Sequence, residues 1–157
     1  MHYTFGAEAL GVSGILSLDI EHRKEHLLTD GRGSVTEAIS HTGEITTYHY
    51  DAFGNTQVRG NSTNPFTYNQ ERVDFVSGLQ YLRARYVDLS LGRFISRDSV
   101  VGTLKDPRTH NLYVYVSNDP LNMIDPSGHI AVAGSNRRQL PKRLFLLLMQ
   151  YEHVGRI

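Results

Sequence analysis

The sequence lacks cysteine and tryptophan altogether among its 157 residues. Without cysteine the chain forms no disulfide and no thiolate metal site, and this absence is compatible with an oxidising or a reducing compartment. An excess of one charge is lacking too, because 16 basic residues balance 16 acidic ones. A neutral chain has no bulk field that would draw it to nucleic acid or to an anionic membrane.

Long hydrophobic runs are also missing. No run approaches the roughly 20 apolar residues of a membrane-spanning helix. A secretory signal peptide has a basic start followed by an apolar core. The N-terminal stretch, MHYTFGAEALGVSGILSLDIEH, has neither a basic start nor a long apolar core. We therefore expect neither a membrane span nor a signal peptide in this chain.

The residues that are plentiful point to strands and tight turns. Nine tyrosines, six phenylalanines and 14 glycines occur in a chain that is 39% hydrophobic, and this composition favours β-structure over a helical bundle. A D-x-x-G turn recurs, in which aspartate bonds its own backbone and glycine takes the positive φ that closes the turn. With its close variants, the turn lies at residues 30–33, 40–43, 51–54, 74–78, 88–92 and 125–128.

Short segments of strand character lie between these turns. Residues 44–50, EITTYHY, are rich in β-branched and aromatic side chains. Residues 81–87 partly alternate basic and apolar positions, as a strand with one face in water does. Turns at such spacing produce serial hairpins, so we predict an all-β meander. The expected strands are 14–20, 26–29, 34–40, 44–50, 57–60, 66–69, 79–87 and 92–96.

The character of the chain changes after Gly128. Residues 135–138 are typical of a linker, and residues 144–149, LFLLLM, form the one strong helix-like segment. Pro141 suits the first turn of such a helix. Six apolar residues are too few to span a membrane, and a run of this kind is more often buried. We therefore add a short C-terminal helix to the predicted all-β fold.

Aspartates gather late in the sequence, and three of them precede proline: Asp106, Asp119 and Asp125. A β-sheet does not require so many carboxylates. One interpretation of these aspartates is therefore a pair of carboxylates placed at the end of the sheet. Turn chemistry is the other, in which Asp98 caps the turn after its strand and Asp125 bonds the backbone of its own Pro-Ser-Gly turn. For Asp106 and Asp119 we favour the turn.

Other kinds of site have less support in the sequence. Among the eight histidines, His22 and His26 alone have a close spacing, and nothing acidic completes a metal set convincingly. Residues 31–33 are too short for a phosphate-binding loop. Four arginines, at 83, 85, 93 and 97, would suit nucleic acid, but the zero net charge favours salt bridges or a wet inner face. We predict no cofactor, no metal and no nucleic-acid binding by the core itself.

Several ordered motifs resemble those of one known family. Residues 50–55, YDAFGN, resemble the YD repeat, and residues 28–35, LTDGRGSV, resemble a second family segment. Residues 79–98, LQYLRARYVDLSLGRFISRD, and residues 118–128, NDPLNMIDPSG, are similar to the Rhs-associated core and its closing D-P-x-G motif. The chain is thus similar to the C-terminal core of an Rhs/YD-repeat polymorphic toxin. The family includes cell-wall-associated WapA proteins and the C subunits of insecticidal toxin complexes.

The resemblance implies a fold, partners and a location. YD hairpins in the family wind into a hollow β-shell, the core closes one end of it, and a variable toxin held inside follows the D-P-x-G motif. On this basis residues 1–25 continue the shell, residues 26–129 form the core, and residues 130–157 belong to a truncated toxin region. The implied partners are the remainder of the shell, the toxin domain and an immunity protein. The implied location of the full-length protein is secreted or at the cell surface.

The resemblance also implies a single self-cleavage in cis by aspartyl-protease-like chemistry. Carried over by position, the carboxylates are Asp98 and Asp125, Arg97 is the neighbouring charge, and the cut lies at about His129–Ile130. Two carboxylates within about 3 Å share one proton, so one of them activates a water while the other protonates the amide. Family members commonly have leucine where this chain has His129.

Two further classes of function stay open beside the autoprotease. One is a shell element without catalysis, whose edge strand is left unpaired because a few hairpins cannot close on themselves. The other is a carbohydrate- or surface-binding module that uses the exposed tyrosines and arginines of residues 79–87. The 28 residues after His129 are too few for an independent toxin fold. We therefore expect the chain to be a fragment of a longer polypeptide.

Overall fold

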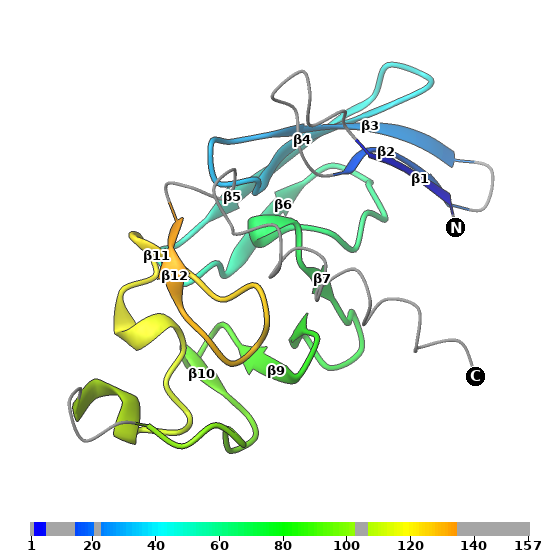
Figure 1. The fold of residues 1–157 in the computed structure, drawn as a ribbon. Coiled ribbons are helices and arrows are strands. Elements are labelled where there is room, and N and C mark those ends of the chain that lie inside the picture. The colour runs from blue at the N-terminus through cyan, green and yellow to red at the C-terminus, as the bar shows by residue number, and fades with distance from the viewer. Residues whose placement is uncertain (1, 6–14, 21–22, 103–106, 135–157) are drawn as a thin grey trace. The chain divides into compact units, whose positions relative to one another are not determined.

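The structure is a computed structural model that describes residues 2–5, 15–20, 23–102 and 107–134. The chain divides into two compact units, Met1–Gly78 and Leu79–Ile157. Strands β1 to β6 make up the sheet of the first unit, and strands β8 to β12 belong to the second (Figure 1). The predicted limits of the core, at residues 26 and 129, rest on motifs rather than on packing and stay a prediction.

The first unit is a six-stranded antiparallel sheet in which the spatial order of the strands is their order in the chain. Figure 1 shows each strand beside the next one along the chain. The predicted meander and the all-β fold class are confirmed. The strands are β1 His2–Phe5, β2 Ile15–Ile20, β3 Arg23–Thr29, β4 Val35–Ser40, β5 Ile45–Tyr50 and β6 Thr56–Arg59.

The D-x-x-G turns close the hairpins as the sequence predicts. Gly33, Gly43 and Gly54 have φ values of 89°, 85° and 97°. Each of their N–H groups donates to the carbonyl of the first residue of the turn, at 3.0–3.1 Å. In the third turn Asp51 Oδ1 also accepts the N–H groups of residues 53–55, at 2.9–3.0 Å. Because the side chain bonds the backbone of the turn, it holds the two flanking strands in register.

The core of the first unit lies on one face of this sheet. Successive side chains of a strand point to opposite faces, so alternate residues of neighbouring strands meet on the same side. Leu27 and Ala38, for example, are partners across β3 and β4. The nearly inaccessible apolar side chains are Leu18, Leu27, Val35, Ala38 and Tyr48.

The strand expected over residues 66–69 is wrong. A 3-10 turn, η2 (Tyr68–Gln70), occupies this place, and both Asn69 and Gln70 have a positive φ. The Asn64 side chain donates to the carbonyl of Phe66 at 2.6 Å and accepts its N–H at 2.9 Å. Local side-chain bonding of this kind competes with strand formation, and here it outweighs the strand propensity of the aromatic residues. The short strand β7, Arg72–Val73, follows the turn.

The single strand expected over residues 79–87 is also wrong. The chain turns at Arg83, whose φ is 59°, and forms an antiparallel hairpin of β8 (Gln80–Leu82) and β9 (Arg85–Asp88), which β10 (Arg93–Phe94) extends. The turn changes which residues share a face. Arg85 therefore lies on the buried side of the hairpin, whereas Tyr86 lies on the exposed side.

Short elements complete the second unit: η3 Pro107–His110, η4 Val116–Asn118, β11 Met123–Ile124 and β12 Val132–Ala133, the last two paired with each other. In η4 all three residues have φ between 42° and 58°, a conformation that costs energy for residues with a Cβ atom. The preceding residue, Tyr115, is buried and lies edge-on to Phe94 with ring centroids 5.7 Å apart. This packing holds the strained turn in place.

The predicted C-terminal helix and the tail at 135–157 lie outside the described residues, as does Asp106. Over the described ranges the helical segments are 3-10 turns of three or four residues. None of the helices in this part of the chain is long and apolar enough to cross a membrane. A closed β-shell stays a prediction.

We predict that Asp51→Ala lowers the free energy of unfolding by about 1–2 kcal/mol, because three backbone N–H groups of the turn lose their acceptor. Asp51→Asn keeps the Oδ1 acceptor and should cost less. Urea unfolding of the two variants measures the difference. Equal losses would mean that the side chain does not hold the turn.

The effect of Asp51→Ala should also depend on pH. Burial raises the pKa of Asp51, but hydrogen bonds from Asn55, Phe53 and Gly54 outweigh it and hold the pKa below its usual value. Such a group stabilises the fold above its unfolded pKa of about 4, and the contribution is lost as the pH falls through the lower folded pKa. The gap in stability between the native sequence and Asp51→Ala should therefore narrow below about pH 4.

Candidate functional site

The two carboxylates singled out in the sequence, Asp98 and Asp125, meet at one cation in the second unit. That cation is Arg85, whose Nη2 lies 2.7 Å from Asp98 Oδ2 and 3.9 Å from Asp125 Oδ2. Asp98 follows β10, and its N–H donates to the Leu112 carbonyl at 3.0 Å. Asp125 directly follows β11. Residues far apart in the sequence are therefore joined by a single guanidinium group.

Arg85 is buried, with 5% of its side chain exposed. It points inward because it follows the hairpin turn on the same face as Leu82 and Val87. Its guanidinium carbon lies 3.5 Å from the centre of the Phe94 ring. Burial lowers the pKa of Arg85, while the two carboxylates raise it, and the net direction is downward. An arginine starts from so high a pKa that the group stays cationic at neutral pH.

The guanidinium also bonds two backbone carbonyls. Nη1 donates to the carbonyl of Leu112 at 3.0 Å, and Nε donates to the carbonyl of Gly128. The two carbonyls and the two carboxylates together contact all three nitrogens of the guanidinium group. A planar group with several fixed donors suits this task better than a lysine would.

Asp125 forms the turn that the sequence predicts for it. Its Oδ1 accepts the N–H groups of four successive residues, 127 to 130, at 2.8–3.2 Å. The hydroxyl of Ser127 also lies 3.1 Å from this oxygen. Its own exposure is 3%. These donors fold residues 125–130 tightly around the carboxylate.

Gly128 brings this turn against the β8–β9 hairpin. Its φ is +77°, and a Cβ atom at this position would collide with the carbonyl oxygen of Leu82. Next to it, the carbonyl of Ser127 accepts the N–H of Ala84 at 3.4 Å. Because a side chain would not fit in this conformation or in this space, glycine is required here.

His129 is the second partner of Asp98. Its Nδ1 lies 2.7 Å from Asp98 Oδ1, and 29% of its side chain is exposed. The same oxygen accepts the N–H of Val100 at 2.8 Å, which is the turn-capping contact expected of Asp98. The position where leucine is usual in the family thus carries a ring that bonds the candidate carboxylate.

The arginine paired with both carboxylates is Arg85, and not Arg97. Arg97 is exposed and lies in the segment after β10, directly before Asp98. Arg85 Nη2 contacts Asp98 and lies near Asp125, and a proton shared by the two carboxylates stays a prediction. Ile130, on the other side of the predicted cut, is 54% exposed. The catalytic assignments themselves stay a prediction.

Sequence reasoning missed Arg85 because it treated residues 79–87 as one strand. In a single strand, Arg83 and Arg85 would occupy the same face. The zero net charge and the neighbouring tyrosines indicated that this face is in contact with water. The turn at Arg83 breaks that alternation. A signal was nevertheless present, since a basic residue flanked by apolar and aromatic residues next to several aspartates indicates a buried ion pair.

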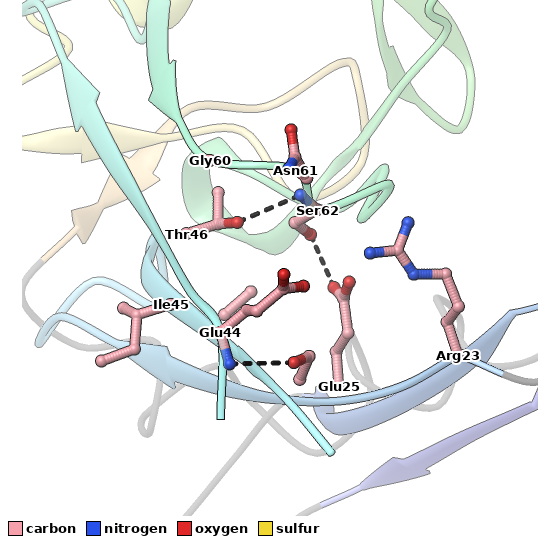
Figure 2. Close-up of a pocket in the computed structure, with 10 residues that line it drawn as sticks. Arg23, Glu25, Glu44, Ile45, Thr46, Gly60, Asn61 and Ser62 are labelled. Atoms are coloured by element: carbon pink, nitrogen blue, oxygen red, sulfur yellow. Dashed lines mark hydrogen bonds between the residues drawn. The ribbon is translucent and has the colours of Figure 1, made fainter. Parts of the chain in front are cut away.

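A separate cleft of about 290 Å³ lies in the first unit (Figure 2). Glu25 and Glu44 extend toward the same space as Arg23. Glu25 is 4% exposed, and its Oε2 accepts the hydroxyl proton of Ser62 at 2.5 Å. The N–H of Ser62 in turn donates to the hydroxyl of Thr46 at 3.0 Å. These bonds tie the loop after β6 to the sheet, so we interpret the cleft as structural.

An exposed tyrosine pair lies on the outer side of the β8–β9 hairpin. Tyr81 and Tyr86 are cross-strand partners with ring centroids 5.0 Å apart, and they are 40% and 39% exposed. Such a pair keeps the carbohydrate- or surface-binding alternative open. Among the described residues no group of three or more histidines and acids is arranged to hold a metal ion.

The chain has relatives among known proteins, although no protein-family model matches it. The tRNA(Glu)-specific nuclease WapA of Bacillus subtilis subsp. natto is 34% identical over 105 residues, which is 64% of this chain and 4% of that protein. The tRNA3(Ser)-specific nuclease WapA of Bacillus spizizenii is 32% identical over 133 residues, which is 81% of this chain and 6% of that protein.

Solved structures show the same relationship. A chain in the crystal structure of TcdB2-TccC3-Cdc42 matches 71% of this chain with a TM-score of 0.59 and 26% identity, and the match covers 5% of that chain. This chain therefore spans about one twentieth of the length of the proteins it matches. The likeness concerns one segment of much longer molecules.

We predict that Arg85→Met destabilises the protein by about 3–5 kcal/mol, because it leaves two buried carboxylates without their cation. Arg97→Met, at an exposed arginine nearby, is the matched control and should cost less than about 0.5 kcal/mol. Urea unfolding measures both.

Adding Asp98→Asn and Asp125→Asn to Arg85→Met should restore part of the loss, since neutral amides tolerate burial without a cation better than carboxylates do. Similar losses for the two arginine variants, or no recovery in the triple variant, would show that the ion cluster does not hold the second unit together.

Proposed function

We propose that this chain, which is related in sequence and fold to Rhs-type and toxin-complex proteins, is a length of β-shell wall and the core that closes the shell. The shell would enclose a C-terminal toxin, and the core would present it. The serial hairpins of the first unit supply the wall, since a meander extends by adding strands at its edges. The second unit supplies the closing end of the core.

The observation that carries this proposal is the clamp on residues 125–130. Asp125 gathers four N–H groups of this segment, and Arg85 ties both Asp125 and the Gly128 carbonyl to the β8–β9 hairpin. The chain therefore leaves the core from a fixed point. Such an anchor suits a core that holds a toxin, because it fixes the chain at the boundary between the core and the toxin.

The partners follow from this role. They are the remainder of the shell, a toxin domain that continues from residues 130–157, and an immunity protein for that toxin. The Bacillus relatives are named as tRNA nucleases, and we assign any such activity to the cargo rather than to residues 26–129. As part of a toxin of this kind, the protein would act outside the cell or at its surface.

Self-cleavage is a second proposal for the same site. Asp98, Asp125 and the peptide groups around His129 and Ile130 lie in one cluster. A cut there would release the toxin from the core while the shell still encloses it. A single turnover in cis needs little binding energy, because the fold itself holds the peptide beside the carboxylates.

A surface- or sugar-binding module is the alternative, and the exposed pair of Tyr81 and Tyr86 favours it. It does not explain why the 125–130 segment is clamped by buried charges. Glycan binding that is lost with Tyr81→Ala, in a protein with no closing role, would favour it over the shell.

The closing role predicts protection of a cargo. In a chimera, residues 26–134 replace the matching segment of the Bacillus spizizenii WapA protein. We expect the C-terminal part of the chimera to resist added protease. The same chimera with Arg85→Met should lose this protection, and Arg97→Met should keep it. Protection that is absent in the chimera, or unchanged by Arg85→Met, would contradict the proposal.

The cleavage proposal predicts a change of mass with time. The purified 157-residue chain should convert to a large and a small fragment separated near residue 129, and Asp98→Asn should stop the conversion because a general base is removed. Intact-mass measurement over hours to days follows the conversion. A native chain that keeps its full mass while folded would contradict self-cleavage but not the closing role.

A further inference from the structure

We infer that the outer face of the β8–β9–β10 sheet is a docking surface for residues 144–149 of the same chain. Three side chains define this outer face: Tyr81, Tyr86 and Ile95. Such docking goes beyond the closing role, because it concerns where the chain is held after it has left the core. It also requires no shell.

The three side chains of the outer face form one row across neighbouring strands. Tyr81 and Tyr86 are cross-strand partners, and the N–H of Ile95 donates to the carbonyl of Tyr86 at 3.0 Å. Their exposed fractions are 40%, 39% and 55%. Side chains in such a row contact one another. The opposite face is buried, and its apolar residues are Leu82, Val87 and Phe94.

The outer face breaks the alternation that a sheet with one side in water shows. An antiparallel sheet of that kind carries apolar residues on the buried side and polar residues outside. The sheet of the first unit follows this rule, since Glu37, Thr47 and Arg59 are partners in a row across β4, β5 and β6. The second unit has aromatic and aliphatic side chains in its outer row instead. An apolar row on the outside of a sheet marks a surface that another segment or molecule covers.

The segment that fits this surface is the apolar run LFLLLM, residues 144–149. Six consecutive apolar side chains are unfavourable in water. The described part of the chain ends at Gly134, whose N–H donates to the Asn122 carbonyl at 2.6 Å. The stretch from residue 134 to residue 144 spans at most about 33–36 Å when extended. A compact unit of about 80 residues has a radius of gyration of only about 12 Å, so the apolar run can reach the outer face.

A tether of this length favours the apolar run over a separate molecule. Binding of a tethered segment is intramolecular, and a short linker gives it an effective concentration in the millimolar range. The two tyrosines suit such docking, because each ring offers a large contact area at a low cost in conformational entropy. If residues 130–157 begin the toxin, as proposed above, the outer face holds the first apolar segment of that toxin against the core.

The absence of tryptophan from the chain allows a direct test. In the full chain, Phe145→Trp places a single emitter in the apolar run. Its emission should lie at a shorter wavelength than in urea, because the outer face shields the ring from water. Adding Tyr86→Ser and Ile95→Ser should move the emission to the wavelength seen in urea. Val58→Ser, at an exposed apolar residue of β6, is the matched control and should leave the emission unchanged.

The absence of cysteine allows the contact to be located. Tyr86→Cys combined with Leu147→Cys should form a disulfide within one molecule under mild oxidation, because such a bond requires Cα atoms within about 7 Å. Val58→Cys combined with Leu147→Cys is the control and should react more slowly by about tenfold or more. The urea midpoint of each variant is measured in parallel, so that only folded proteins are compared.

An emission of Phe145→Trp that already lies at the urea wavelength, or that Tyr86→Ser and Ile95→Ser leave unchanged, would overturn the docking. Equal disulfide rates in the two cysteine pairs would overturn it too. Disulfides that join two molecules would assign the outer face to a second copy of the chain instead. These outcomes leave the closing role untouched, because the chimera used to test that role contains residues 26–134 and lacks the apolar run.

Discussion

The buried guanidinium of Arg85 is the interaction on which the second unit depends. Two carboxylates, Asp98 and Asp125, would be costly to bury without it, and it would be costly to bury without them. The same group holds the carbonyls of Leu112 and Gly128. In this unit, whose strands are short, the charged cluster joins distant segments alongside buried apolar side chains such as Phe94 and Tyr115.

The first unit is held together differently. The hairpins from β3 to β6 are closed by local bonds between the first side chain of a turn and the backbone that follows, as Asp51 shows with residues 53–55. These bonds need no partner from elsewhere in the chain. A wall made of such units can be lengthened without changing its chemistry, which suits the long relatives of which this chain matches a small part. In the proposed shell, the two units would serve two tasks, extension and closure.

The candidate site follows from that closure. A turn built on Asp125 is ordinary by itself, since aspartate before Pro-Ser-Gly bonds its own backbone in many loops. The turn is a candidate site because Gly128 allows it to approach the β8–β9 hairpin closely. There Arg85 contacts the carbonyl oxygen of Gly128 and a second carboxylate, Asp98. His129 then adds a polar ring where the related motif has an apolar one.

Features that depend on neighbours along the chain could be predicted from the amino-acid sequence. The turn at Asp51, its repeats, the meander and the proximity of Asp98 to Asp125 all follow from local patterns or from motifs read in order. What depends on the face that a residue occupies could be found only from the folded chain. The turn at Arg83 placed Arg85 on the buried face of the hairpin and Tyr86 on the exposed face. Side chains alternate at every residue of a strand, so one unrecognised turn reassigns all those after it.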